Sequence, residues 1–147
     1  MARPWVELSA QECARLIAGG GVGRIAVCTP MGPQIYPVAF VVASEAIIFR
    51  TTPYGTLGTL GLGTAAAFEV DDLDPAQQAG WSVVATGLAQ AMSDPDEIAD
   101  LRERGEPQPW VDGLRTLYIR LKWRTITGRR IGAQTVRPST SDASLVG

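Results

Sequence analysis

Short segments with the residue pattern of β-strands follow one another along this chain. Several alternate apolar and polar residues with a period of two, and Gly, Pro or polar clusters separate them. The last strand has one face that meets solvent, because apolar residues alternate with basic ones: Leu117, Ile119, Leu121 and Trp123 with Arg120, Lys122 and Arg124. The six predicted strands are residues 22–29, 34–43, 46–52, 64–71, 81–92 and 116–127.

Two short helices are predicted, one before the first strand and one between the last two strands. Ser9 and Glu12 form a capping box, in which each side chain satisfies the other residue's backbone donor, and this pair opens the first helix. Asp94 is a good N-cap, and Pro95 at the first helical position opens the second. Residues 53–63 are ambiguous: Leu57, Leu60 and Leu62 fit a third short helix that faces a core, whereas four Gly give that helix low propensity.

Two positions inside strands predict irregular pairing. Pro37 cannot donate to a hydrogen-bond ladder, so it indicates a sheet edge, a bulge or a kink on the side of a ligand. Gly87 indicates a bulge or a bend. The polar residues 72–80 predict a loop.

Together these elements predict a mainly β fold: a six-stranded antiparallel barrel, closed or partly open, with two or three short helices. Helices do not alternate with the strands, and no repeat or linker divides the chain. We therefore expect one domain over residues 1–132 and a disordered tail over 133–147.

Composition narrows the cellular setting. The 147 residues suffice for one domain, and no apolar run approaches the roughly 20 residues of a membrane span. The first residues lack the apolar core of a signal peptide, so we expect a cytoplasmic protein without a membrane partner. The net charge of −2 gives no overall case for nucleic acid, although seven of the thirteen basic residues lie between Arg115 and Arg137. That stretch interleaves few aromatic residues, which argues against single-stranded nucleic acid.

The chain contains no His, which excludes Ser/His/Asp and Cys/His nucleophilic sites and His-bound zinc or haem. Cys13 and Cys28 are predicted to be buried free thiols. If the protein is an enzyme, a bound organic cofactor therefore supplies the chemistry.

The end of the third strand is the main candidate site. Arg50, Thr51 and Thr52 precede a turn with Gly55 and Thr56, which offers a guanidinium, hydroxyl groups and backbone N–H groups of the kind that bind phosphate. The alternative is an ordinary strand end with Arg50 in solvent.

Two further residues have open assignments. Arg24 is a cation inside an apolar strand and needs a partner, which is either Glu69 or Asp71 or an anionic ligand. Trp81 either packs in the core or stacks on an aromatic ligand or a partner chain.

The succession of motifs resembles the pyridoxamine 5′-phosphate oxidase-like, FMN-binding split-barrel proteins, over nearly the whole chain up to Ile131. The motifs are, in order, VGRIAV, YPVAF, IIFRTTPYGT, AFEVDD, GWSVVATGLAQ and TGRRI. The resemblance implies a homodimer with flavin in clefts between the subunits. It implies that Arg50, Thr51 and Thr52 contact the FMN phosphate and ribityl chain, that Pro37 and Val38 lie beside the ring, and that Trp81 and Ser82 reach the cleft, from their own or the second subunit.

One position departs from the family pattern. Relatives commonly have a Lys after the Thr that corresponds to Thr56, and this chain has Leu57. Loss of that cation removes a charge-assisted contact worth roughly 1.5–3 kcal/mol. The resemblance thus implies an oxidoreductase that uses FMN or, alternatively, a deazaflavin, acting on a small-molecule substrate that the sequence does not identify. Leu57 motivates the second hypothesis, a non-catalytic flavin-binding or structural dimeric module.

Overall fold

The strands form one antiparallel sheet that closes on itself. The computed structural model describes residues 4–110 and 113–132, so the tail predicted for residues 133–147 lies outside the described residues. The elements are β1 (Trp5–Leu8), α1 (Ala10–Ile17), β2 (Gly21–Thr29), β3 (Gly32–Ala43), β4 (Ala46–Thr51), the 3₁₀ helix η1 (Thr56–Leu62), β5 (Thr64–Asp74), β6 (Ala79–Ala91), α2 (Pro95–Arg104) and β7 (Leu117–Ile131).

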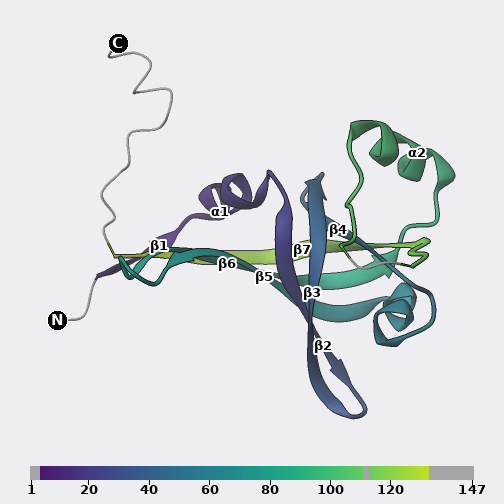
Figure 1. Ribbon diagram of the computed structural model, residues 1–147, viewed down its shortest axis with the longest axis horizontal. Helices are drawn as coiled ribbons and strands as arrows, with labels where there is room; N and C mark the ends of the chain where they lie inside the picture. Colours follow the sequence, from purple (N-terminus) through teal and green to yellow (C-terminus); the bar gives the residue numbers. More distant parts are fainter. Residues whose placement is uncertain (1–3, 111–112, 133–147) are drawn as a thin grey trace.

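Six of the strands make a ring in the order β7-β4-β3-β2-β5-β6, and β6 pairs with β7 to close it. This confirms the predicted six-stranded antiparallel barrel. The long strands β6 and β7 run along the longest dimension of the molecule (Figure 1). The seventh strand, β1, pairs with Gly128–Ile131 on the edge of β7 that β4 occupies further back.

The ring is split at β3. This strand pairs with β2 from Gly32 to Phe40, but with β4 only from Phe40 to Ala43. The tip of the hairpin of β2 and β3, beyond the residues of β2 that pair with β5, therefore projects from the sheet (Figure 1). Pro37 lies on the stretch of β3 that β4 does not pair, which confirms the edge position among the three alternatives and explains how the strand tolerates a proline.

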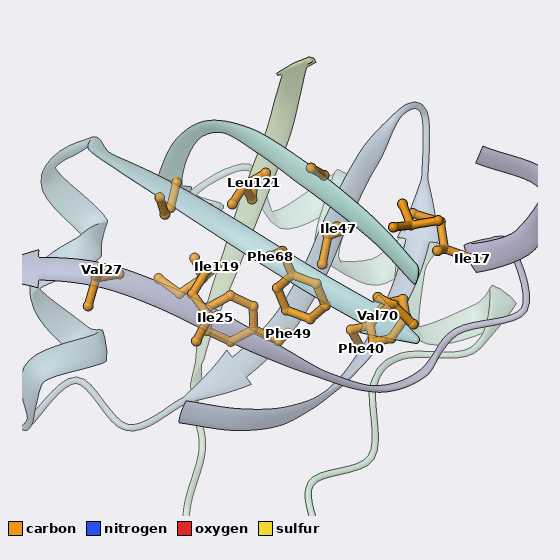
Figure 2. Close-up of a cluster of buried hydrophobic side chains, with 14 of the residues drawn as sticks. Ile17, Ile25, Val27, Phe40, Ile47, Phe49, Phe68, Val70, Ile119 and Leu121 are labelled. Carbon is orange, nitrogen blue, oxygen red and sulfur yellow. The ribbon is translucent and has the colours of Figure 1, made fainter. Parts of the chain in front are cut away.

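Inward-facing side chains from all six ring strands fill the barrel. Phe40 and Phe68 meet edge to face with ring centroids 5.0 Å apart, and Phe49 stacks on Phe68 at 6.5 Å. These rings lie among the aliphatic residues of the core in Figure 2. α1 begins at the predicted Ser9 capping box and adds Ile17 to the core. α2 packs outside the ring, where Leu101 joins a second cluster with Ile48, Met92 and Tyr118.

Four predictions from the sequence were wrong in detail. β1 was not predicted, because three of its four residues are exposed and it has no inward-facing period. β7 extends to Ile131 instead of residue 127, because it pairs with both β1 and β6 there. The predicted loop 72–80 is largely a hairpin in which β5 reaches Asp74 and β6 begins at Ala79. Cys28 is exposed, because it shares the outward face of β2 with Arg24; Cys13 is buried as predicted.

Gly87 was read correctly, because the pairing of β6 with β7 shifts by one residue between Thr86 and Gly87. A Cβ atom at this glycine would lie 2.1 Å from the carbonyl oxygen of Lys122. The bulge therefore requires glycine at a point of close backbone approach.

Candidate functional site

Strand alternation in β4 turns the Arg50 side chain away from the barrel interior. Phe49 is fully buried and Thr51 is 5% exposed, so both face the core, while Arg50 between them faces outward. Arg50 pairs with Tyr118 across the β4–β7 ladder. The Arg50 side chain is only 21% exposed, so the alternative in which solvent surrounds it is wrong.

Protein groups already hold part of the Arg50 guanidinium. Its Nε donates to the carbonyl oxygen of Arg115 at 3.1 Å, and its Nη1 donates to Oε1 of Glu106 at 3.3 Å. The guanidinium carbon lies 5.2 Å from the centre of the Tyr118 ring, within range of a cation–π interaction. A guanidinium has five N–H donors, so within residues 4–110 and 113–132 these two contacts leave the Nη2 donors for another acceptor.

Glu106 is shared by two arginines. Its Oε2 accepts a hydrogen bond from the Tyr118 hydroxyl and lies 3.5 Å from Nε of Arg102. Arg102 also donates to the Tyr118 hydroxyl at 3.2 Å and lies 5.7 Å from the Tyr118 ring centre. The hydrogen bond to Tyr118, with a smaller contribution from Glu106, raises the pKa of Arg102. We call Arg50, Arg102, Glu106 and Tyr118 the Arg50 cluster.

The turn after β4 follows Arg50 directly in the chain and offers further polar groups. The Thr52 hydroxyl oxygen accepts from the N–H of Tyr54 at 3.3 Å, which leaves its own proton to be donated elsewhere. Gly55 has φ 156°, and Gly55 and Thr56 are both exposed. A Cβ atom at Gly58 would lie 2.5 Å from the carbonyl oxygen of Pro53, so the turn is as tight as glycine permits.

The structure explains why position 57 has no cation. Leu57 is half-buried and packs against the barrel core, and Leu60 on the next turn of η1 is fully buried. η1 therefore uses Leu57 and Leu60 to cover the end of the barrel, while Leu62 is exposed. In this chain position 57 stabilises the fold.

Pro37 and Val38 lie on the neighbouring strand. Pro37 is exposed, whereas Val38 turns inward and packs against the core. The last residue pair between β3 and β4 is Phe40 with Phe49, so Arg50 and Val38 lie just beyond the point where the strands separate. Along residues 32–39, within the part of the chain that the structure describes, no second strand covers this edge of β3. Its backbone donors and acceptors are available to a ligand.

Arg24 faces outward on β2 opposite Pro37, and two carboxylates bind it. Its Nε donates to Glu69 at 2.8 Å and its Nη2 to Asp71 at 2.9 Å, which confirms the acidic partners among the alternatives. The hydrogen bond that Arg24 donates to Glu69 raises the pKa of Arg24. Burial, and then the neighbouring Asp71, raises the pKa of Glu69 despite the arginine. We call Arg24, Glu69 and Asp71 the Arg24 cluster.

Trp81 and Ser82 form a separate group at the start of β6. Trp81 packs against the barrel core, as the commoner role of a tryptophan predicts, and Ser82 lies opposite Asp71 and Arg129. β4 and β6 both pair with β7, but Arg50 lies opposite Tyr118 and Trp81 lies opposite Arg130. These two positions are twelve residues apart on β7, which is roughly 40 Å along the strand. The nine predicted site residues thus fall into two groups: Pro37, Val38, Arg50, Thr51, Thr52, Gly55 and Thr56 in one, and Trp81 and Ser82 in the other.

The sequence analysis missed three members of the Arg50 cluster. Glu106 lies in an irregular loop just after Gly105 ends α2, so no periodic pattern singles it out. Tyr118 and Arg102 gain their importance only when the β4–β7 ladder and α2 bring them to Arg50. The one local signal is the i,i+4 spacing of Arg102 and Glu106, which favours an ion pair on a helix.

Comparisons with known proteins agree with this architecture. A structure from Corynebacterium glutamicum is 30% identical with a TM-score of 0.73, covering 88% of this chain and 99% of its own. The FAD binding protein of Mycobacterium smegmatis is 32% identical with a TM-score of 0.70, covering 86% and 97%. An uncharacterized protein of Mycobacterium tuberculosis is 35% identical, covering 93% of this chain and 92% of its own. The family model described as pyridoxamine 5′-phosphate oxidase matches residues 9–130, and the chain belongs to that family.

Proposed function

We propose that this protein binds a flavin nucleotide, with FAD as the first candidate, and uses it as a flavin-dependent oxidoreductase. The observation that carries the proposal is the 32% identity, over 86% of this chain, with a protein named for FAD binding. Pyridoxamine 5′-phosphate oxidase activity itself is not part of the proposal.

The Arg50 cluster supports binding of the phosphate groups. The Nη2 donors of Arg50, the Thr52 hydroxyl and the backbone around Gly55 and Thr56 lie at one strand end, which suits an anion that needs several donors. Leu57 leaves Arg50 to balance the phosphate charge without a lysine at this position. A terminal phosphate monoester carries about −1.5 to −2 charges at pH 7, and a diphosphate bridge carries one charge on each of its two phosphates, so the preference for FAD rests on the identity with the FAD binding protein and not on charge.

The uncovered edge of β3 supports binding of the ring. Backbone groups around Pro37 and Val38 can pair with its polar edge, and the flavin supplies hydride chemistry when bound. The protein's own residues then orient the ring and limit access of water.

No helix in the two described stretches has the length or the apolar character to span a bilayer.

We extend the proposal to a homodimer in which the partner chain completes the cleft. Four large apolar side chains lie in the loops on either side of the Arg50 strand end and are at least 83% exposed: Tyr54, Leu62, Trp110 and Leu114. Such exposure favours a protein partner. Trp81 and Ser82 of a second copy would then approach the Arg50 group. Light scattering after size exclusion is expected to give twice the chain mass of 15.6 kDa.

Fluorescence titration of the purified protein tests the cofactor. FAD, FMN, riboflavin and a deazaflavin are titrated in parallel at low and at moderate salt. We expect micromolar or tighter binding of FAD that weakens with salt, and weaker binding of riboflavin, which has no phosphate. Absence of binding by all four would overturn the proposal.

Turnover separates the enzyme from the non-catalytic module that Leu57 first motivated. A flavin-loaded protein that oxidises NADPH or a chemical reductant and passes electrons to an artificial acceptor is an oxidoreductase. A protein that binds FAD tightly and transfers no electrons is a flavin carrier.

A further inference from the structure

We propose that Glu106 competes with the cofactor phosphate for Arg50, and that Arg102 takes over the Glu106 carboxylate when phosphate binds. Glu106 thereby sets the affinity of the site for phosphate-bearing ligands. The inference rests on the proposed function in taking Arg50 as the phosphate anchor.

The contacts of Glu106 divide between two cations. Its Oε1 accepts from Arg50 at 3.3 Å, and its Oε2 lies 3.5 Å from Nε of Arg102 and accepts from the Tyr118 hydroxyl. The carboxylate is 20% exposed and lies in the loop that follows α2. A small rotation about its side-chain torsions is enough to exchange one arginine for the other.

This arrangement lowers the attraction of Arg50 for anions. A phosphate that approaches Arg50 meets a guanidinium whose charge Glu106 already balances, and the carboxylate itself repels the phosphate. Attraction returns when the carboxylate moves to Arg102. Because the Arg102 side chain is 61% exposed and lies one helical turn before Glu106, it can follow the carboxylate.

The main rival is that Glu106 orients Arg50 for phosphate instead of opposing it. The Arg115 carbonyl already fixes the Arg50 Nε, and the Tyr118 ring limits the plane of the guanidinium. Orientation therefore does not depend on Glu106. The two ideas predict opposite signs: removal of the charge at Glu106 strengthens phosphate binding under competition and weakens it under orientation.

The experiment compares Glu106→Gln with a control that changes the net charge equally. Glu103→Gln alters an exposed carboxylate on α2, three residues away. We expect Glu106→Gln to tighten FAD and FMN binding roughly tenfold at low salt. Glu103→Gln should change affinity much less, and riboflavin should bind all three proteins equally. Unchanged or weakened FAD binding in Glu106→Gln, or an equal gain in Glu103→Gln, would overturn the inference.

A double-mutant cycle tests the exchange independently if Glu106→Gln alone perturbs the loop. Arg102→Ala removes the alternative partner of Glu106, so it should weaken FAD binding in the natural background. The same change should have a much smaller effect in the Glu106→Gln background. Equal effects in the two backgrounds would mean that Arg102 contributes only its charge, and would contradict the exchange.

Inorganic pyrophosphate separates failure of this inference from failure of the proposed function. If no flavin binds, the proposed function falls. Titration with pyrophosphate, followed through the Arg50 Nε–H resonance by NMR, still decides about Glu106. Tighter pyrophosphate binding by Glu106→Gln than by the natural protein supports competition, and equal or weaker binding overturns it.

Discussion

The Arg50 cluster and the Arg24 cluster are alike in construction and opposite in charge. Each has an arginine on the outward face of a ring strand, half-buried and hydrogen-bonded to carboxylate. Arg24 has two carboxylates, Glu69 and Asp71, so that cluster carries a net charge of −1. Arg50 shares the single carboxylate of Glu106 with Arg102, so that cluster carries +1. A half-buried arginine is thus no anion site by itself, because the number of nearby acids decides the sign of the local charge.

The difference also separates stability from binding. The three hydrogen bonds of Arg24 to carboxylates tie β2 to β5 within the ring. The two hydrogen bonds of Arg50 tie β4 to the loop before β7 and, among the residues that the structure describes, leave the Nη2 donors without a carboxylate. We therefore expect changes in the Arg50 cluster to affect ligand binding and changes in the Arg24 cluster to affect folding.

Arg50→Ala is expected to produce the largest effect. It removes a charge-assisted contact worth roughly 1.5–3 kcal/mol, which corresponds to about a tenfold to hundredfold loss of FAD affinity. Arg120→Ala is the matched control, since Arg120 also faces outward near α2 but is paired with Glu97. Fluorescence titration measures both. Equal losses in the two variants would show that Arg50 has no special position.

Leu57→Lys adds a second cation after the strand that carries Arg50. We expect roughly tenfold tighter FMN binding, together with a loss of about 1 kcal/mol in the free energy of unfolding, because Leu57 packs against the core. Leu57→Met keeps the packing and should leave both quantities nearly unchanged. The measurements are flavin titration and urea unfolding. A gain in stability for the lysine variant would contradict the structural role of this position.

Arg24→Met removes the only cation of the Arg24 cluster. It leaves Glu69 and Asp71 side by side without a cation, so the free energy of unfolding should fall by about 1 kcal/mol. That figure is discounted because the Arg24 side chain is 38% exposed. Urea unfolding at pH 7 measures the loss. A variant as stable as the natural protein would mean that the two carboxylates do not need Arg24.

Glu69→Gln gives the smallest effect, which depends on pH. The raised pKa of Glu69 means that the folded state binds its proton more tightly than the unfolded state. This group therefore contributes stability below its ordinary pKa of 4.5 that is lost as pH rises through the folded value. Relative to Glu69→Gln, the natural protein should lose about 1 kcal/mol or less between pH 4 and pH 7. Asp72→Asn, which changes an exposed carboxylate on the same hairpin, is the control. A natural protein that gains stability relative to Glu69→Gln between pH 4 and pH 7 would contradict the raised pKa of Glu69.

Much of the fold was predictable because local patterns determine it. The alternation of residues 116–127, the capping box at Ser9 and the glycine at position 87 each act through neighbours in sequence or through one ladder. Each prediction was confirmed, except that Tyr118 on the face expected to meet solvent is buried in the cluster with Leu101 of α2. Arg24 was predictable in part, because a charged residue inside an apolar strand requires a partner. The exposed strand β1 was not, since its pairing depends on the distant residues 128–131.

The candidate site was less predictable because its charges come together only in the folded chain. The sequence alone singled out Arg50 and the two threonines after it. The acid that balances Arg50 lies 56 residues further along, in a loop without any periodic pattern. Position 57 was predictable in part, because the leucines of residues 53–63 fit a helix that faces the core. The structure places Leu57 and Leu60 there and leaves Leu62 exposed.

A crystal structure of the protein grown with FAD tests the central claim most directly. We predict phosphate oxygens within hydrogen-bond distance, about 2.9 Å, of the Arg50 guanidinium, with the Glu106 carboxylate turned toward Arg102. Phosphates bound away from Arg50, with Glu106 still paired to it, would contradict the account.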